Sequence, residues 1–67
     1  MGEVIIWVKD NGRGRIAGHS KADYSPLPLG AIPITRVPEC DTELMLEWIR
    51  KQIALGWSAK RMRAQCR

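Results

Sequence analysis

The histidine and cysteine side chains, which are the usual zinc ligands, number three: His19, Cys40 and Cys66. A structural zinc site needs four ligands, usually in closely spaced pairs, and the sequence has no such pair. A histidine base needs a nucleophile and an orienting acid, and the spacing places no such set around His19. We therefore expect His19 to be a turn residue at the end of a strand, with no metal, no cofactor and no enzymatic activity.

The cysteine count also bears on the compartment. Small secreted scaffolds usually carry four, six or eight cysteines, whereas this chain has two. The apolar run Val4–Val8 is too short for the core of a signal peptide or for a membrane span. We expect a cytoplasmic protein with reduced thiols and no membrane partner. A Cys40–Cys66 disulfide is an open alternative, because it would close a long loop.

Positive charge is concentrated at the C-terminal end. Residues 50–67 carry six basic side chains and no acidic one, whereas residues 1–49 carry five basic and seven acidic side chains. In a helix, Lys60, Arg63 and Arg67 share one face and could contact successive nucleic-acid phosphates. An acidic protein surface is an alternative target, and a solvated basic tail is the simplest reading.

Two further arginines flank Gly14 in a predicted hairpin tip and could add a second phosphate contact. The candidate nucleic-acid-binding residues are therefore Lys60, Arg61, Arg63, Arg67, Arg13 and Arg15.

The first segment predicts a β-hairpin. β-Branched and aromatic residues dominate Glu3–Lys9, and the pair Asn11-Gly12 is typical of a two-residue turn. This turn places Asp10 opposite Arg13, Val8 opposite Arg15, Trp7 opposite Ile16 and Ile6 opposite Ala17. Because the first strand is apolar on both faces, it needs cover on both sides. Gly14 and Gly18 indicate a bulge or a close backbone approach in the return strand.

All four prolines lie in the middle of the chain. The segment Ser25–Gly30 should be extended, and its leucines favour packing across the core or across a partner. The segment Ala31–Val37 alternates weakly and predicts a third strand, which Pro33 confines to the sheet edge.

A helical period follows Pro38. We expect a first helix over about Thr42–Leu55, capped by Asp41 or Thr42 or starting at Pro38, and ended by Gly56. Ser58 should cap a second helix over Ala59–Cys66 or to the chain end. This pair resembles the first two helices of a helix-turn-helix. The recognition helix is missing, which favours phosphate contact over base readout.

The first helix is apolar over about half of its circumference, interrupted only by Gln52. That arc is wider than the stripe of a simple surface helix, so a partner or a second copy is expected to cover part of it. Aromatic residues can anchor partners, although in so small a chain tryptophans more often belong to the core. The candidate partner-binding residues are Leu44, Met45, Trp48, Ile49, Leu55 and Trp57.

Together these patterns predict one small α+β domain over residues 1–67. It has a β-hairpin in residues 1–19, a Pro-rich extended segment in 20–40 and two helices in 41–67. The hairpin, with a possible third edge strand, should pack on the helix-turn-helix-like pair. The predicted function is non-enzymatic regulation through binding of DNA or RNA. This protein is expected to be a dimer through the Leu44–Leu55 helix. The alternative is an inhibitor or adaptor, of the kind that phages and other compact genomes encode, that docks its apolar helix and Pro-Leu segment on a partner protein. The expected assembly is thus a homodimer or a hetero-complex.

Overall fold

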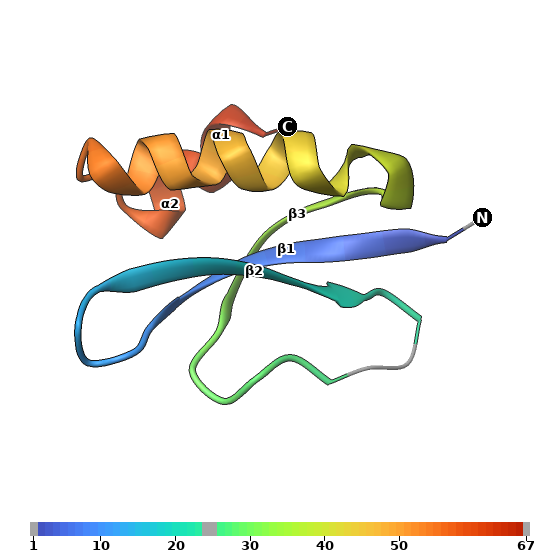
Figure 1. Ribbon diagram of the computed structural model, residues 1–67, viewed down its shortest axis with the longest axis horizontal. Helices are drawn as coiled ribbons and strands as arrows, with labels where there is room; N and C mark the ends of the chain where they lie inside the picture. Colours follow the sequence, from blue (N-terminus) through green and yellow to red (C-terminus); the bar gives the residue numbers. More distant parts are fainter. Residues whose placement is uncertain (1, 24–25, 67) are drawn as a thin grey trace.

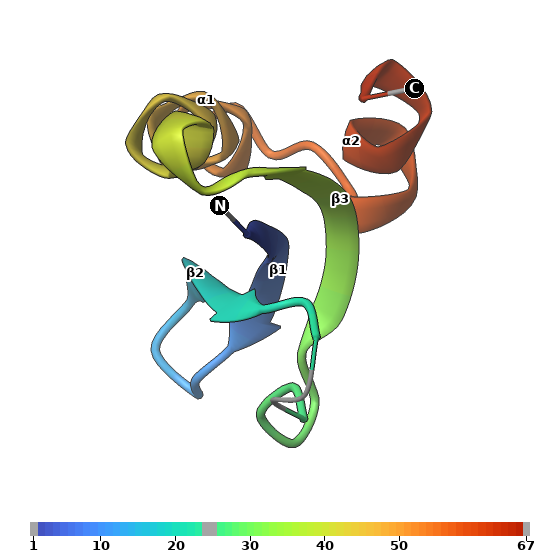
Figure 2. The ribbon, with the colours of Figure 1, turned by 90° about the vertical axis from the view of Figure 1, so that its right-hand side faces the viewer.

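Two helices cover one face of a three-stranded antiparallel sheet in the computed structural model, which describes residues 2–23 and 26–66 (Figures 1 and 2). The elements in chain order are β1 (Glu3–Asp10), β2 (Arg15–Lys21), β3 (Ile32–Pro38), the 3-10 turn η1 (Glu39–Asp41), α1 (Thr42–Ala54) and α2 (Ala59–Gln65). The strand order is β2-β1-β3. The α+β class and the third edge strand predicted from the sequence are both confirmed.

The core lies between the sheet and the helices. Alternate residues of β1 point into it because successive side chains of a strand face opposite ways: Val4, Ile6 and Val8. The helices contribute Leu46, Ile49 and Met62 to the same cluster. Burial of these side chains fixes α1 and α2 on the sheet, and so fixes the position of every charged residue that the helices carry.

The β1–β2 hairpin has the predicted strands in a different register. Asp10 lies opposite Arg15 and Trp7 opposite Gly18, so residues 11–14 form the loop. The Asp10 carboxylate accepts the Gly12 N–H at 2.9 Å, and the Asn11 side chain accepts the Arg13 N–H at 3.0 Å, which lengthens the predicted two-residue turn. The following predicted pairs are therefore wrong: Asp10–Arg13, Val8–Arg15, Trp7–Ile16 and Ile6–Ala17.

The shift is by two residues, so every side chain of the hairpin stays on the face predicted for it. His19 is an exposed residue within β2 rather than a turn residue, because the longer loop moves β2 along the chain.

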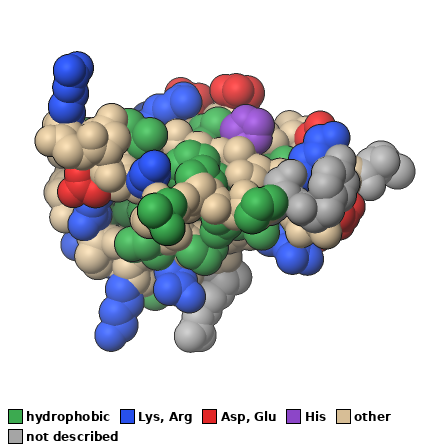
Figure 3. Space-filling view, turned by 90° about the horizontal axis from the view of Figure 1, so that it is seen from below, with side chains coloured by type: hydrophobic (Ala, Val, Ile, Leu, Met, Phe, Trp, Pro, Cys, Tyr) green, Lys and Arg blue, Asp and Glu red, His purple; other side chains and the backbone are tan. Residues whose placement is uncertain are grey.

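Trp7 covers part of the sheet face opposite the helices. Its ring lies over Gly18, where a Cβ would overlap the ring atoms, and its Nε1 donates to Ser20 Oγ at 3.0 Å. The close backbone approach predicted at Gly18 is confirmed. Around it this face is open: Figure 3 shows hydrophobic side chains at its centre and Lys and Arg side chains near its edges. The cover predicted for both faces of β1 is therefore present on one face only, where the helices pack; on the other face the Trp7 ring of β1 folds over β2.

The strand β3 pairs with β1 at the edge of the sheet. A shift in register between Ile6 and Trp7 leaves Ile34 as an extra residue and places Pro33 opposite Trp7. In the preceding segment, Leu27 and Pro28 are half-buried, whereas Leu29 is 93% exposed. Only part of the predicted Pro-Leu segment therefore packs against the protein, and Ser25 lies outside the described residues.

The two helices end close to the predicted positions. Gly56, with a φ of 82°, follows the end of α1, and the Ser58 side chain accepts the Arg61 N–H at 3.1 Å at the start of α2. Helix α1 starts at Thr42 as predicted, with Asp41 in the N-cap position. Asp41 makes no side-chain capping hydrogen bond, and Thr42 Oγ1 donates to the Glu39 carbonyl at 2.7 Å, because η1 leads directly into the helix.

Gln52, the one polar residue within the predicted apolar arc of α1, is not exposed to solvent. It is buried, and its Nε2 donates to the Trp48 carbonyl oxygen at 3.2 Å. Its own carbonyl oxygen accepts the Trp57 N–H at 3.0 Å. Across the described ranges, neither helix combines the length and the hydropathy that a membrane span requires.

Candidate nucleic-acid interface

In Figure 1 the hairpin loop and the turn that leads into α2 lie towards the same end of the long axis, whereas Figure 2 shows α2 itself beside β3. Arg15, the first residue of β2, donates from Nη1 to the Trp57 carbonyl oxygen at 2.8 Å. Trp57 belongs to the turn between α1 and α2. This hydrogen bond connects the hairpin to the turn before α2. These two segments were predicted to contact phosphates separately.

Trp57 also orients a second arginine. The guanidinium carbon of Arg61 lies 4.0 Å from the centroid of the Trp57 ring, and the ring in turn meets Trp48 edge to face at 6.0 Å. A guanidinium stacked on an aromatic ring keeps its N–H groups in the plane, where they can donate to a phosphate. The fold therefore holds Arg15 and Arg61 on either side of one residue.

Further cations lie on the same hairpin and the same two helices. Arg13 in the hairpin loop and Lys60 and Arg63 on α2 are exposed. Arg50 of α1 lines the same shallow hollow as Arg15. The set is called the basic end below and comprises Arg13, Arg15, Arg50, Lys60, Arg61 and Arg63. Arg67, predicted to continue the row on α2, lies outside the described residues.

Arg50 is a member of this set that was not predicted as a site residue. Its position in the basic segment 50–67 was visible, but its approach to Arg15 depends on how α1 packs over β2. Arg36 of β3 is a further cation near α2, since it borders the same hollow as Arg63. Arg36 also contacts Glu3, with 3.7 Å between its Nη1 and the carboxylate, and both side chains are exposed.

Acidic side chains gather at the other end of the long axis. Glu39, Asp41 and Glu43 lie at the start of α1, where the Glu39 N–H donates to the Gly2 carbonyl oxygen beside the start of β1. Figure 1 shows this end opposite the hairpin loop. Asp10 lies beside the loop, and one of its carboxylate oxygens is engaged by the Gly12 N–H. The charge is thus polarised along a molecule about 32 Å long.

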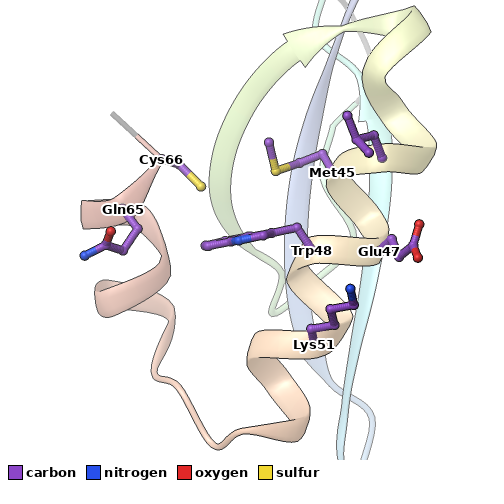
Figure 4. Close-up of a pocket in the computed structure, with 7 residues that line it drawn as sticks. Met45, Glu47, Trp48, Lys51, Gln65 and Cys66 are labelled. Carbon is purple, nitrogen blue, oxygen red and sulfur yellow. The ribbon is translucent and has the colours of Figure 1, made fainter.

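The predicted partner-binding residues do not form one surface. Ile49 has no exposed surface and belongs to the core, so its placement on a partner-binding surface is wrong. Trp48 and Trp57 are half-buried against each other. Leu44 and Leu55 are each 72% exposed. Figure 4 shows the groove between α1 and α2, which is lined by Leu44, Met45, Glu47, Trp48, Lys51, Gln65 and Cys66.

The residues that could support other chemistry lie apart. Cys40 and Cys66 are free thiols, and burial raises the pKa of the Cys66 thiol. Among the described residues, His, Cys, Asp and Glu side chains form no group of three that could hold a metal ion.

Comparisons with protein-family models, with curated proteins and with solved structures each found no match. Function is therefore inferred from the geometry and charge of the surface itself.

Proposed function

We propose that the protein is a small, non-enzymatic regulatory protein of the cytoplasm that binds nucleic acid through the basic end. The observation that carries this proposal is the convergence of Arg15 and Arg61 on Trp57. A solvated tail would leave its cations independent of one another, whereas here a hairpin and a helix hold theirs at one residue.

The chemistry of the basic end suits phosphate. Five of its six cations are arginines, whose planar guanidinium matches two phosphate oxygens at once. Phosphate contact needs no recognition helix, so the incomplete helix-turn-helix pattern does not argue against it. Both DNA and RNA present the same backbone charge, and binding of either is expected to weaken steeply as salt rises.

The proposal is tested by measuring the affinity for mixed-sequence DNA and RNA over a range of salt concentrations. The test variant is Lys60→Ala/Arg63→Ala, which removes two positive charges from the basic end. Lys21→Glu is the matched control, because it lowers the net charge by the same amount at the end of β2 remote from the hairpin loop.

We expect the wild-type affinity to fall linearly on a log–log plot against salt. The slope should become shallower by about two in the double variant and stay unchanged in the control. Absence of salt-dependent binding by the wild type would refute the proposal. An equal loss in test and control variants would also refute it, since net charge alone would then explain the binding.

The alternative function, an inhibitor or adaptor that docks on another protein, is favoured by one observation. Leu29, Leu44 and Leu55 are large apolar side chains with most of their surface exposed. If a defined protein partner forms a complex that the Leu29→Ser variant loses while nucleic acid is not bound, this alternative replaces the first proposal. The basic end would then steer association with an acidic surface.

A further inference from the structure

Helix α1 and its C-cap residue Leu55 carry a stripe of exposed and half-buried side chains at the spacing of a coiled-coil seam. Leu44, Trp48, Lys51 and Leu55 follow one another at intervals of four, three and four residues, the alternation that keeps side chains facing a neighbouring helix. Leu44 and Leu55, at the two ends of the stripe, are each 72% exposed, Lys51 is exposed and Trp48 is half-buried. We call this set the α1 stripe.

The α1 stripe borders the groove between the two helices. Met45 and Trp48 point from α1 towards α2, and Cys66 points from α2 towards α1, as Figure 4 shows. Glu47 points away from α2 on the outer side of α1. The groove has a volume of about 570 Å³, which leaves room for large apolar side chains from a second helix.

We infer that a second copy of this chain covers the α1 stripe, with the two α1 helices antiparallel about a two-fold axis. The stripe reads apolar, aromatic, basic, apolar along the helix. With the axis between Trp48 and Lys51, Leu44 of each copy lies opposite the partner's Leu55, and Trp48 lies opposite the partner's Lys51. Leucine thus meets leucine, and an ammonium meets an indole, which attract each other.

The charges select this orientation. In the antiparallel pair Glu47 comes within about one residue of the partner's Lys51 along the helix axis, and the two-fold symmetry repeats this attractive contact. A parallel pair would bring Lys51 against the partner's Lys51 within the seam itself. Like charges at a helix interface repel, so the parallel orientation is disfavoured. In the antiparallel orientation each residue of the stripe instead faces a residue that attracts it.

The contact involves one short helix and the rim of α2 from each copy. The surface that this contact buries is small for a protein interface, so we expect a weak dimer, with a Kd on the order of 10–100 µM. This inference is independent of nucleic-acid binding, since none of the stripe residues belongs to the basic end.

Charge exchange between two variants tests the pairing. Sedimentation equilibrium from about 1 µM to 1 mM, a range that brackets the expected Kd, would be run on wild type, Glu47→Lys and Lys51→Glu. The wild type should dimerise, and each variant alone should associate at least tenfold more weakly. An equimolar mixture should regain a dimer near wild-type strength, because one variant carries lysine and the other glutamate at both positions.

Matched controls lie on the same helix outside the stripe. Glu43→Lys and Arg50→Glu make the same changes of charge at other exposed sites of α1 and should dimerise like the wild type. Circular dichroism should show every variant folded, since the substituted side chains are exposed. A wild type that stays monomeric throughout would overturn the inference and leave the stripe to another protein. It would also be overturned by unaffected single variants, or by a mixture that fails to recover.

Discussion

Gly18 marks a place where the sheet has no room for a side chain. The indole of Trp7 lies directly on its backbone and is held there by the hydrogen bond to Ser20 Oγ. A glycine in a strand loses more conformational freedom on folding than other residues do. Burial of most of the Trp7 ring, on the face that the helices leave open, offsets this cost.

Gly18→Ala should therefore destabilise the fold by about 1–3 kcal/mol, because the Trp7 ring must move to admit the methyl group. Urea unfolding measures this loss. Gly2→Ala is the control: a Cβ there meets its nearest neighbour at an ordinary 3.8 Å, so the stability should stay within about 0.5 kcal/mol of wild type. A Gly18→Ala protein as stable as this control would contradict the close packing described.

Substitution of Arg61 tests whether its contact with the Trp57 ring contributes to nucleic-acid affinity beyond its charge. Arg61→Lys preserves the charge but loses the planar group that lies on Trp57, so we expect nucleic-acid affinity to fall about three- to tenfold. Lys60→Arg, one residue away, keeps the charge and leaves the Arg61–Trp57 contact in place, so it should bind at least as tightly as the wild type. Equal affinities for Arg61→Lys and wild type would show that the Trp57 platform contributes nothing.

At the scale of elements, α2 depends on its cap. It has seven residues, too few to be stable as an isolated helix, and its first turn is satisfied by the Ser58 side chain. Its main apolar anchor is Met62, which is fully buried in the core, and Ala59 packs beside it.

Ser58→Ala should cost about 1 kcal/mol and increase hydrogen exchange in α2 more than elsewhere. Because asparagine caps helices about as well as serine, Ser58→Asn should behave like the wild type. Uniform exchange across α1 and α2 in the alanine variant would contradict the view that the cap acts locally. Stability by chemical denaturation and amide exchange by NMR supply the two measurements.

Local signals explain which elements the sequence could predict. Gly56 and Ser58 end one helix and start the next through contacts with their own neighbours, and both boundaries were predictable. The hairpin register was not, because two side-chain contacts, from Asp10 and Asn11 to loop amides, outweighed the preference of Asn-Gly for a two-residue turn. The helix boundaries and the hairpin register are thus both determined by contacts between residues only a few positions apart in the sequence.

The candidate site, in contrast, depends on contacts between residues that are far apart in the sequence. All arginines of the basic end except Arg50 were predicted from the sequence, but the contact of Arg15 with Trp57 joins residues far apart in the chain. No periodicity or turn signal encodes such a contact. The burial of Ile49 and Gln52, which the width of the apolar arc could not assign, likewise depends on where the sheet lies against α1.

For the whole molecule, stability rests on a small core. Sheet and helices share one cluster of buried side chains, and Met62 attaches α2 to it. A domain of this size has a margin of only a few kcal/mol. One deep cavity could therefore remove most of the stability.

Met62→Ala is expected to cost about 2–5 kcal/mol and to leave a large fraction unfolded at room temperature. Thermal melting followed by circular dichroism would show it. Leu29→Ala removes a side chain that is 93% exposed and should melt like the wild type. A Met62→Ala protein with an unchanged melting temperature would mean that α2 contributes little to the shared core.

The separation of acidic and basic ends also has a kinetic consequence. An electric dipole along the 32 Å axis experiences a torque in the field of a polyanion, which turns the basic end towards it while the two molecules are still apart. The acidic end is repelled, so unproductive encounters become rarer before any atoms touch. Salt should accordingly slow association more than it hastens dissociation, because screening removes the torque at a distance.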